Sequence, residues 1–324
     1  MTNILLQQAK TSQLKDQTQV TSSGPSIPEA GKTLARFIGY VEAGMREGTF
    51  KGQPNGKKSL RAYLFFELLG AKHIIEDDEH GTYVKDGKKY RTTLFRLQTD
   101  IKLNERANFR KLFMKMRNGR EDITHTSQLL SEPYIITITH NSKGEGEQKK
   151  TYANMRNADG EWGIAPPLHE DAVSGEVVAI PVPEPTRPYQ LLLWDHPTKE
   201  QWDSIFIDGT TTRKNDKGEE VEVSRNWLQN EIVSKALDYE GSAVHDLLDG
   251  IGGLTLDADA VDDTSAVGGN EDEHVDEEVK KPAEEPAPET KEPVAEKKAA
   301  EPVKEAKPAD DDATTAALRE LGLV

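Results

Sequence analysis

Basic and aromatic residues recur along the first half of the chain in a pattern that suits contacts to phosphates and bases. Basic side chains neutralise phosphates, and aromatic rings offer faces on which bases stack, each stacked base contributing roughly 1–3 kcal/mol. The candidates are Arg36, Tyr40, Phe50, Lys51, Lys57, Lys58, Arg61, Tyr63, Tyr90, Arg91, Arg96, Lys149, Lys150, Tyr152, Arg156 and Trp162. Together they predict a surface for single-stranded nucleic acid, although each one alone also fits an ordinary sheet or core residue.

Charge is distributed unevenly along the 324 residues. Residues 31–156 carry 24 Lys or Arg and 15 Asp or Glu, a net charge of +9. Residues 157–256 carry 7 and 19, a net charge of −12. The overall net charge of −16 therefore hides a basic half that suits an anionic ligand, whereas the acidic half is not expected to bind nucleic acid.

The basic half contains the patterns of five strands and one helix. Alternating apolar and polar residues predict strands at residues 32–44, 59–70, 88–98, 133–141 and 149–156. Between the third and fourth strands, apolar residues recur at helical spacing, with Asn104 as the expected N-cap and Gly119 after the end. Residues 45–58 contain Gly, Pro and Asn together with several basic residues, and we expect them to form a long, flexible, positive loop.

This order of elements is that of an OB-fold, a five-stranded, partly open Greek-key barrel. We therefore predict a mainly β fold with α: an OB-fold barrel, an α/β C-terminal extension and disordered termini. In an OB-fold the ligand binds across the second and third strands and in the loops between strands one and two and between strands four and five. The candidate residues are concentrated in these places.

Composition divides the chain into four regions. We expect a disordered N-terminal arm (1–30), an OB-fold nucleic-acid-binding core (31–160), an acidic α/β extension packed on the core (161–252) and a disordered acidic tail (253–324). From residue 257 onward the chain carries 21 Asp or Glu, 8 Lys or Arg and no Phe, Trp or Tyr, a composition that cannot build a core. Near its end, acidic and apolar residues predict a partner-binding tip: Asp310, Asp311, Asp312, Leu318, Leu321, Leu323 and Val324.

The sequence gives no indication of catalysis, a cofactor or a metal. Histidines occur singly, and no Walker loop, G-x-S-x-G turn or dinucleotide-binding glycine motif is present. The chain has no cysteine for a disulfide or a thiolate metal site. No apolar run approaches the ~20 residues of a membrane span, and the first residues lack a signal-peptide pattern. We expect a soluble, intracellular, non-enzymatic protein.

Several segments resemble motifs of single-stranded-DNA-binding proteins of tailed bacteriophages. They are KTLARFIGYVEAG, LFFELLG, NFRKLFMKMRN, LWDHPTKEQWDSIFIDG and NWLQNEI, within residues 28–250. The resemblance implies an OB-fold protein that coats single strands during phage replication or recombination in the host cytoplasm. Related binders often end in a disordered acidic tail that docks replication or recombination proteins. This chain departs from the bacterial tail, because it ends in ATTAALRELGLV and not in a Pro-Phe tip.

Two other function classes fit parts of the same sequence. A phage structural or protein-interaction scaffold would direct the basic surface toward an acidic protein and would show no preference for single strands. An enzyme of nucleotide metabolism would need convergent carboxylates or a metal site. The sequence does not determine the oligomeric state, the DNA site size, the choice between DNA and RNA, or the partner.

Overall fold

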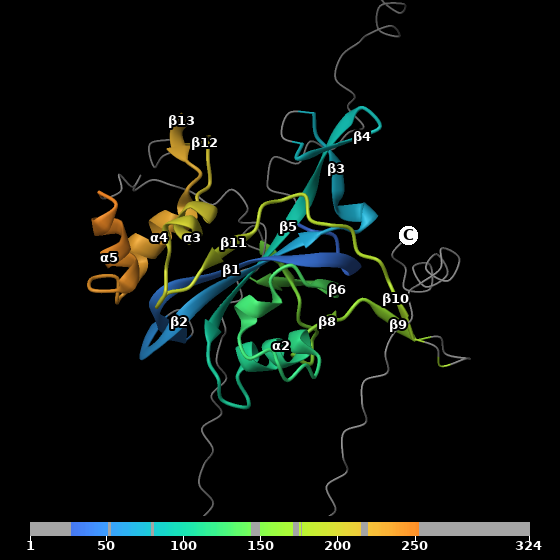
Figure 1. The fold of residues 1–324 in the computed structure, drawn as a ribbon, viewed down its shortest axis with the longest axis horizontal. Helices are drawn as coiled ribbons and strands as arrows, with labels where there is room; N and C mark the ends of the chain where they lie inside the picture. Colours follow the sequence, from blue (N-terminus) through green and yellow to red (C-terminus); the bar gives the residue numbers. More distant parts are fainter. Residues whose placement is uncertain are drawn as a thin grey trace, which may run out of the picture.

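The computed structural model describes residues 27–252, apart from residues 51–52, 79–80, 144–149, 171–174, 176 and 215–219. The side chains of residues 49, 50, 143 and 214 are also outside the description. Most of the expected N-terminal arm and the whole acidic tail, including its partner-binding tip, lie outside the described residues. The described part is mainly β, with a few short helices (Figure 1).

A curled, mostly antiparallel sheet forms the centre of the protein (Figure 1). Its principal strands are β1 (Gly31–Phe50), β2 (Gln53–Leu68), β3 (Ile74–Glu76), β5 (Lys88–Ile101), β6 (Pro133–Lys143) and β7 (Lys150–Asn154). They follow the spatial order β3-β5-β2-β1-β6-β7. Three short strands pair with this series: β4 (Tyr83–Lys85) with β5, β8 (Ile164–Ala165) with β6, and β11 (Gln190–Leu192) in parallel with β1.

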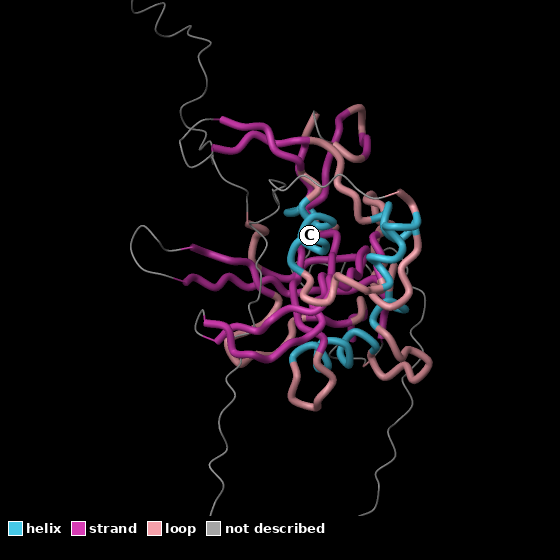
Figure 2. The backbone as a smooth tube through the Cα atoms, turned by 90° about the vertical axis from the view of Figure 1, so that its left-hand side faces the viewer, coloured by secondary structure: helices cyan, strands magenta, loops and turns pink. Residues whose placement is uncertain are grey.

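Smaller elements surround the sheet. They are the 3-10 helices η1 (Ala71–His73) and η2 (Thr126–Leu129), the helices α2 (Asn108–Arg117), α3 (Lys199–Ser204), α4 (Trp227–Lys235) and α5 (Ala243–Gly250), and the strand pairs β9 (Leu168–Glu170) with β10 (Val177–Ala179) and β12 (Thr210–Lys214) with β13 (Glu220–Ser224). Helices lie mainly to one side of the strands, and strand pairs project on the other (Figure 2). Among the described helices, none is both long enough and apolar enough to cross a bilayer.

The stretch expected to be a flexible loop, residues 45–58, is instead the outer part of a long β-hairpin. β1 and β2 continue through it as paired strands, with Glu47 opposite Lys58 and Thr49 opposite Pro54. Residues 53–58 of β2 are exposed, so burial does not hold this part of the hairpin together. Backbone pairing extends the strands beyond the core, and the register places the opposite charges of Glu47 and Lys58 across from each other.

Helix α2 forms where the apolar stripe predicts it, but it begins later than expected. Ala107, not Asn104, is the N-cap, and its N–H donates to the carbonyl oxygen of Asn104 at 3.0 Å in a preceding turn. The predicted end is confirmed, because Asn118 and Gly119 have φ values of 47° and 76°. A left-handed backbone after the last helical turn is a common way for a helix to end.

The central sheet has a hydrophobic core on each face, because both sides of β1 and β2 are apolar. The inner core joins Phe37, Leu64, Phe66 and Phe95 to the buried side of α2. The outer core joins residues such as Val41, Tyr63 and Phe65 to Trp194, Trp202, Trp227 and Ile232. Since neighbouring residues of a strand point to opposite faces, Tyr63 and Leu64 belong to different cores. Helices α3, α4 and α5 lie together beside β1 and β2, and α2 lies below them (Figure 1).

Two buried charged residues bind the connector, residues 180–189, which joins β10 to β11. Arg36 donates from Nε to the carbonyl oxygen of Pro183 at 2.8 Å. The carboxylate of Glu67, which is fully buried, accepts hydrogen bonds from the N–H of Thr186 at 3.0 Å and from the hydroxyl of Thr92 at 2.5 Å. These bonds satisfy both charges and hold the connector across the sheet.

Residues just after the expected boundary at 160 still belong to the barrel. Trp162 and Ile164 lie in the inner core, and β8 pairs with β6. The chain reaches the outer core only at β11, after the connector. The packing therefore changes from one face of the sheet to the other near residue 190.

Candidate nucleic-acid interface

The outer face of β2 and β5, where an OB-fold would bind its ligand, is covered by α4. Tyr63 is only 1% exposed, and its ring meets that of Trp227 edge-on with centroids 5.5 Å apart. Its hydroxyl donates to Oε1 of Glu231 at 2.7 Å. Arg96 is 8% exposed, with its guanidinium carbon 4.5 Å from the centre of the Trp227 ring. The expectation that Tyr63 and Arg96 contact nucleic acid is therefore wrong, because a tryptophan occupies the space a base would need.

The hydroxyl of Tyr63 is held in its neutral form. Burial, together with the nearby charge of Glu231 and the hydrogen bond to it, raises the pKa of Tyr63 well above its usual value. A neutral phenol can donate the hydrogen bond that the carboxylate accepts. The contact between β2 and α4 thus combines ring packing with a charge-assisted hydrogen bond.

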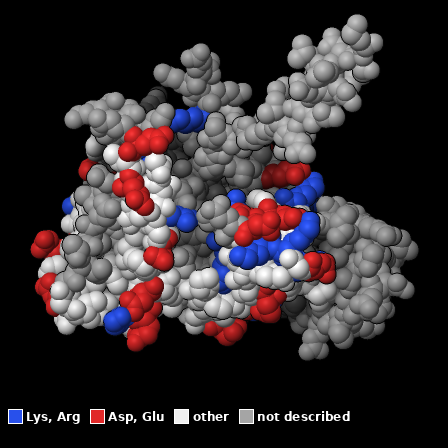
Figure 3. Space-filling view, turned by 90° about the horizontal axis from the view of Figure 1, so that it is seen from above, with Lys and Arg blue, Asp and Glu red and all other residues white. Residues whose placement is uncertain are grey.

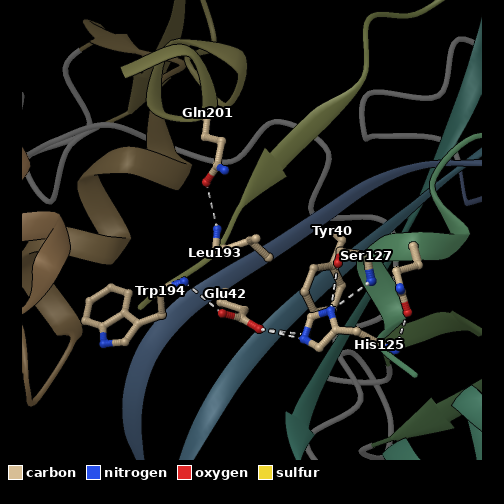
Figure 4. A network of polar contacts seen from close by, with 8 residues as sticks. Tyr40, Glu42, His125, Ser127, Leu193, Trp194 and Gln201 are labelled. Carbon is tan, nitrogen blue, oxygen red and sulfur yellow. Dashed lines mark hydrogen bonds and ion pairs between the residues drawn. The ribbon is translucent and has the colours of Figure 1, made fainter. Parts of the chain in front are cut away.

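Tyr40, a second candidate, lies in the inner core and takes part in a buried polar network (Figure 4). Its hydroxyl donates to Oε1 of Glu42 at 2.9 Å, and the backbone N–H of Trp194 donates to Oε2 at 2.7 Å. The network joins β1 to the chain just after β11. Because the ring of Tyr40 has no exposed surface, its predicted role in base stacking is wrong.

His125 approaches Glu42 from the other side of this network (Figure 4). Nε2 of His125 lies 3.6 Å from Oε1 of Glu42, and Nδ1 lies 2.7 Å from Oγ of Ser127. Burial alone would raise the pKa of Glu42, but the interactions with His125, Trp194 and Tyr40 outweigh it and lower the pKa. Glu42 is therefore a stable carboxylate.

The series Ser127–His125–Glu42 has the order of a nucleophile, a base and a carboxylate, yet its geometry is that of a helix cap. Nδ1 of His125 accepts the backbone N–H of Ser127 at 3.2 Å, and Oε1 of Gln128 accepts the backbone N–H of His125 at 2.8 Å. Both bonds are parts of the capping box of η2. The separation of 3.6 Å between His125 and Glu42 is also longer than an N–H···O hydrogen bond.

Two further candidates, Arg36 and Trp162, have structural roles. Arg36 is buried beneath the connector, so it cannot neutralise a phosphate. Trp162 is 4% exposed, its indole N–H donates to the carbonyl oxygen of Asn108 at 2.9 Å, and the guanidinium carbon of Arg156 lies 5.4 Å from its ring centre. Stacking on Trp162 is therefore excluded in this conformation. Arg156 also donates from Nε to the carbonyl oxygen of Gly160 at 3.2 Å.

The remaining described candidates keep some accessible surface, and they lie on hairpins. Lys57 and Lys58 are exposed on the β1–β2 hairpin, and Lys150 is exposed beside the half-buried Tyr152 on β7. Arg61, at the inner end of the exposed part of β2, is mostly buried against Asp100, with a contact of 2.8 Å. The structure does not describe the side chains of Phe50, Lys51 and Lys149.

The β3–β4–β5 region carries Tyr90 and Arg91 together with an aromatic partner that the sequence reasoning missed. Tyr83 stacks on Tyr90, with ring centroids 5.8 Å apart and an interplanar angle of 25°. The Asp86-Gly87 turn is the feature of the sequence that could have revealed this pair, because it places Tyr83 and Tyr90 opposite each other in the β4–β5 hairpin.

Charges around this stacked pair are mixed. Arg91 pairs with Asp77 at 2.8 Å, and Lys88 pairs with Glu76 at 2.8 Å. A view from above likewise shows Lys and Arg side chains beside Asp and Glu (Figure 3). Among the described residues, no group of three or more His, Asp or Glu converges as a metal site.

The accessible candidates do not form one compact site. Leu60 pairs with Ile101 at one end of the β2–β5 ladder, and Leu68 pairs with Thr93 at the other. Lys58 lies beyond the first end and Tyr90 beyond the second. At about 3.3 Å per residue, they are roughly 40–45 Å apart along the strands.

Known proteins offer no identification. No family model, curated protein or solved structure matches the chain.

Proposed function

We propose that the protein binds single-stranded DNA without strong sequence preference and recruits replication or recombination proteins through its acidic tail. The observation that carries this proposal is the strand order. β1 lies between β2 and β6, β5 lies beside β2, β7 lies beside β6, and α2 lies in the chain between β5 and β6. This order is compatible with an OB-fold barrel, a fold that commonly binds oligonucleotides, and it supports the proposal.

The proposed contacts differ from those of an OB-fold with an open face. Because α4 covers β2 and β5, the strand must be bound by exposed residues of the hairpins. Lys57 and Lys58 supply charge on one hairpin, and Tyr90 supplies a ring on another. A site of this kind combines phosphate contacts with base stacking, and sequence preference is expected to be weak.

Titration of a labelled oligo-dT, followed by fluorescence anisotropy, tests the proposal. All four tryptophans are buried, so a labelled oligonucleotide is a better probe than intrinsic fluorescence. We expect tighter binding to the single strand than to a duplex of equal length, with a log–log salt slope of about −0.7 per phosphate contacted. Absence of binding at low salt, or equal affinity for the duplex, would contradict the proposal.

The covered face of β2 and β5 also favours a second candidate function, that of a protein-interaction scaffold. In this case the exposed lysines would bind an acidic protein, and the central sheet would hold them in place. Equal and weak binding to single strands and duplexes in the same titration would favour the scaffold.

A further inference from the structure

The chain between β5 and η2 is strongly basic, although none of its residues is among the candidates from the sequence. Residues 102–120 carry seven Lys or Arg and one Glu, a net charge of +6. The β1–β2 hairpin, residues 46–58, has a net charge of +3, and residues 74–91 have a net charge of −1. Positive charge is therefore concentrated around α2.

One face of α2 holds the helix on the barrel, and the other carries this charge outward. Phe109, Leu112 and Met116 are buried in the inner core. The opposite face carries Lys111 and, one turn later, Lys115, both exposed. Like charges at this spacing destabilise a helix by about 0.2–0.5 kcal/mol, so folding alone does not explain the exposed Lys111.

Three cations of this region have no described partner. Arg106, Arg110 and Lys111 make no ion pair or side-chain hydrogen bond with any residue that the structure describes. Their neighbours are engaged, since Lys115 donates to the carbonyl oxygen of Trp162 at 2.8 Å and Arg120 pairs with Glu132 at 3.0 Å. Arg106, Arg110 and Lys111 are therefore available to an anionic ligand.

Apolar surface accompanies these charges. Met114, on the outer side of α2, is 41% exposed, and Leu103, just before the helix, is 70% exposed. A flexible thioether beside cations can contact the flat face of an unstacked base. A single strand offers such faces next to its phosphates, whereas a duplex keeps its bases stacked inside.

The α2 region is continuous with the base of the β1–β2 hairpin. Leu60 of β2 pairs with Ile101, the last residue of β5, and the chain then enters the basic stretch at Lys102. The exposed Lys57 and Lys58 lie just beyond this pair. Helix α2 lies at the bottom of the molecule, at the opposite end from β3 and β4 (Figure 1).

We propose that Arg106, Arg110 and Lys111 form a binding surface for the phosphate backbone of single-stranded nucleic acid, continuous with Lys57 and Lys58. This inference rests on the proposed function and names its main site. It places that site on α2 and the neighbouring β1–β2 hairpin, away from the face of β2 and β5 that α4 covers. The strand then crosses α2, with Met114 beside its bases.

Charge removal tests the surface. In the full chain, the triple substitution R106Q/R110Q/K111Q should make the log–log salt slope for oligo-dT less steep by about 2, at 0.7 per phosphate contact. The matched control, K199Q/R213Q/K235Q, removes three exposed cations from the acidic extension and should leave the slope unchanged. Circular dichroism and thermal melting check that both variants fold.

The outcomes separate this inference from the proposed function. If the wild-type chain fails to bind oligo-dT, both are overturned. If it binds and the triple variant keeps the wild-type slope, the α2 surface is wrong, the proposed function stands, and an acidic protein becomes the better partner for these cations.

A second test measures how bound oligo-dT protects a single thiol on α2 from a maleimide. The chain has no cysteine, so Lys111→Cys introduces a unique thiol on the exposed face of α2. Oligo-dT should slow its reaction with a maleimide at least several-fold, whereas a thiol at Lys199→Cys should react at the same rate with and without oligo-dT. Equal reaction rates at position 111 with and without a saturating strand would overturn the inference.

Discussion

The ring of Tyr63 meets the ring of Trp227 edge-on, with an interplanar angle of 83°, and this contact closes the outer face of β2. Edge-to-face aromatic pairs contribute about 0.5–1.5 kcal/mol beyond the burial of their area. The pair joins a strand of the basic half to a helix of the acidic half. It explains why Tyr63, which the sequence predicts to contact nucleic acid, is a core residue.

Substitution of Tyr63 should change stability and not affinity. We expect Tyr63→Ala to lower the free energy of unfolding by about 3–5 kcal/mol, as for other large aromatic truncations in a core. Tyr63→Phe should lose only the bond to Glu231, about 1–2 kcal/mol. Urea unfolding measures both effects. A Tyr63→Phe variant with unchanged stability and weaker oligo-dT binding would contradict the assignment.

The acidic extension should be inseparable from the barrel. A chain ending at residue 188 lacks Trp194, Trp202 and Trp227, and it exposes the apolar side of β1 and β2, including Val41 and Phe65. We expect this variant to aggregate or to bind a hydrophobic dye. A chain ending at residue 252 should stay folded and serves as the control. Cooperative unfolding of a soluble, monomeric 1–188 chain would show that the outer core is dispensable.

Tyr90 should contribute to binding as an accessible ring. We expect Tyr90→Ala to weaken oligo-dT binding by about 1–3 kcal/mol, which is the range for one stacked base. Tyr90→Phe should retain most of the affinity, because it keeps the ring. Tyr189→Ala removes an exposed tyrosine elsewhere on the protein and should have no effect on anisotropy titrations. Equal affinities of the Tyr90→Ala and Tyr189→Ala variants would exclude Tyr90 from the site.

Stability should fall in acid through Glu42. Its pKa in the folded protein is lowered, so its carboxylate stabilises the fold above the unfolded pKa of about 4.3. That contribution is lost as the pH falls through the folded pKa. Glu42→Gln should cost about 1–3 kcal/mol at pH 7, because the amide places a donor against the N–H of Trp194 or the hydroxyl of Tyr40. Urea unfolding between pH 3 and 7 should show that the free energy of unfolding falls less with decreasing pH in this variant than in the wild type. An equal decrease in both proteins would exclude Glu42 as a source of the acid sensitivity.

The acidic tail gives a prediction that is independent of the described residues. Deletion of residues 257–324 changes the net charge from −16 to −3. If the tail competes with phosphate for the basic surface, the shortened chain should bind oligo-dT more tightly at low salt. Removal of residues 318–324 alone should spare DNA binding and abolish partner recruitment in a pull-down. Unchanged affinity after the full deletion would mean that the tail does not reach the surface.

Local sequence patterns predicted the elements of the barrel well. The five strands and α2 all form where the periodicity places them, because alternate apolar residues on a strand, or residues one turn apart on a helix, must face the same core. The hairpin of residues 45–58 was missed because Gly, Pro and Asn favour loops locally, while the pairing that extends β1 and β2 depends on two segments at once.

The candidate site was predicted less well, and Arg96 shows why. A sequence records that Arg96 is basic and lies on the outward side of its strand. It does not record that a helix about 130 residues later in the chain places Trp227 against it. Arg36 and Trp162 are similar cases, since a distant segment accepts the hydrogen bond of the polar group that suggested an exposed role. Tyr40 differs, because its hydroxyl donates to Glu42 on the same strand.

By itself, the sequence determined the mainly β core, the separation of basic and acidic halves and the position of α2, because these follow from local periodicity and composition. Only the tertiary structure decided whether the outer face of the sheet is open. Both faces of β2 are apolar enough to be buried, so the choice depended on whether a later part of the chain covers the second one. The extension does so, and the accessible positive charge that remains is concentrated on the hairpins and on α2.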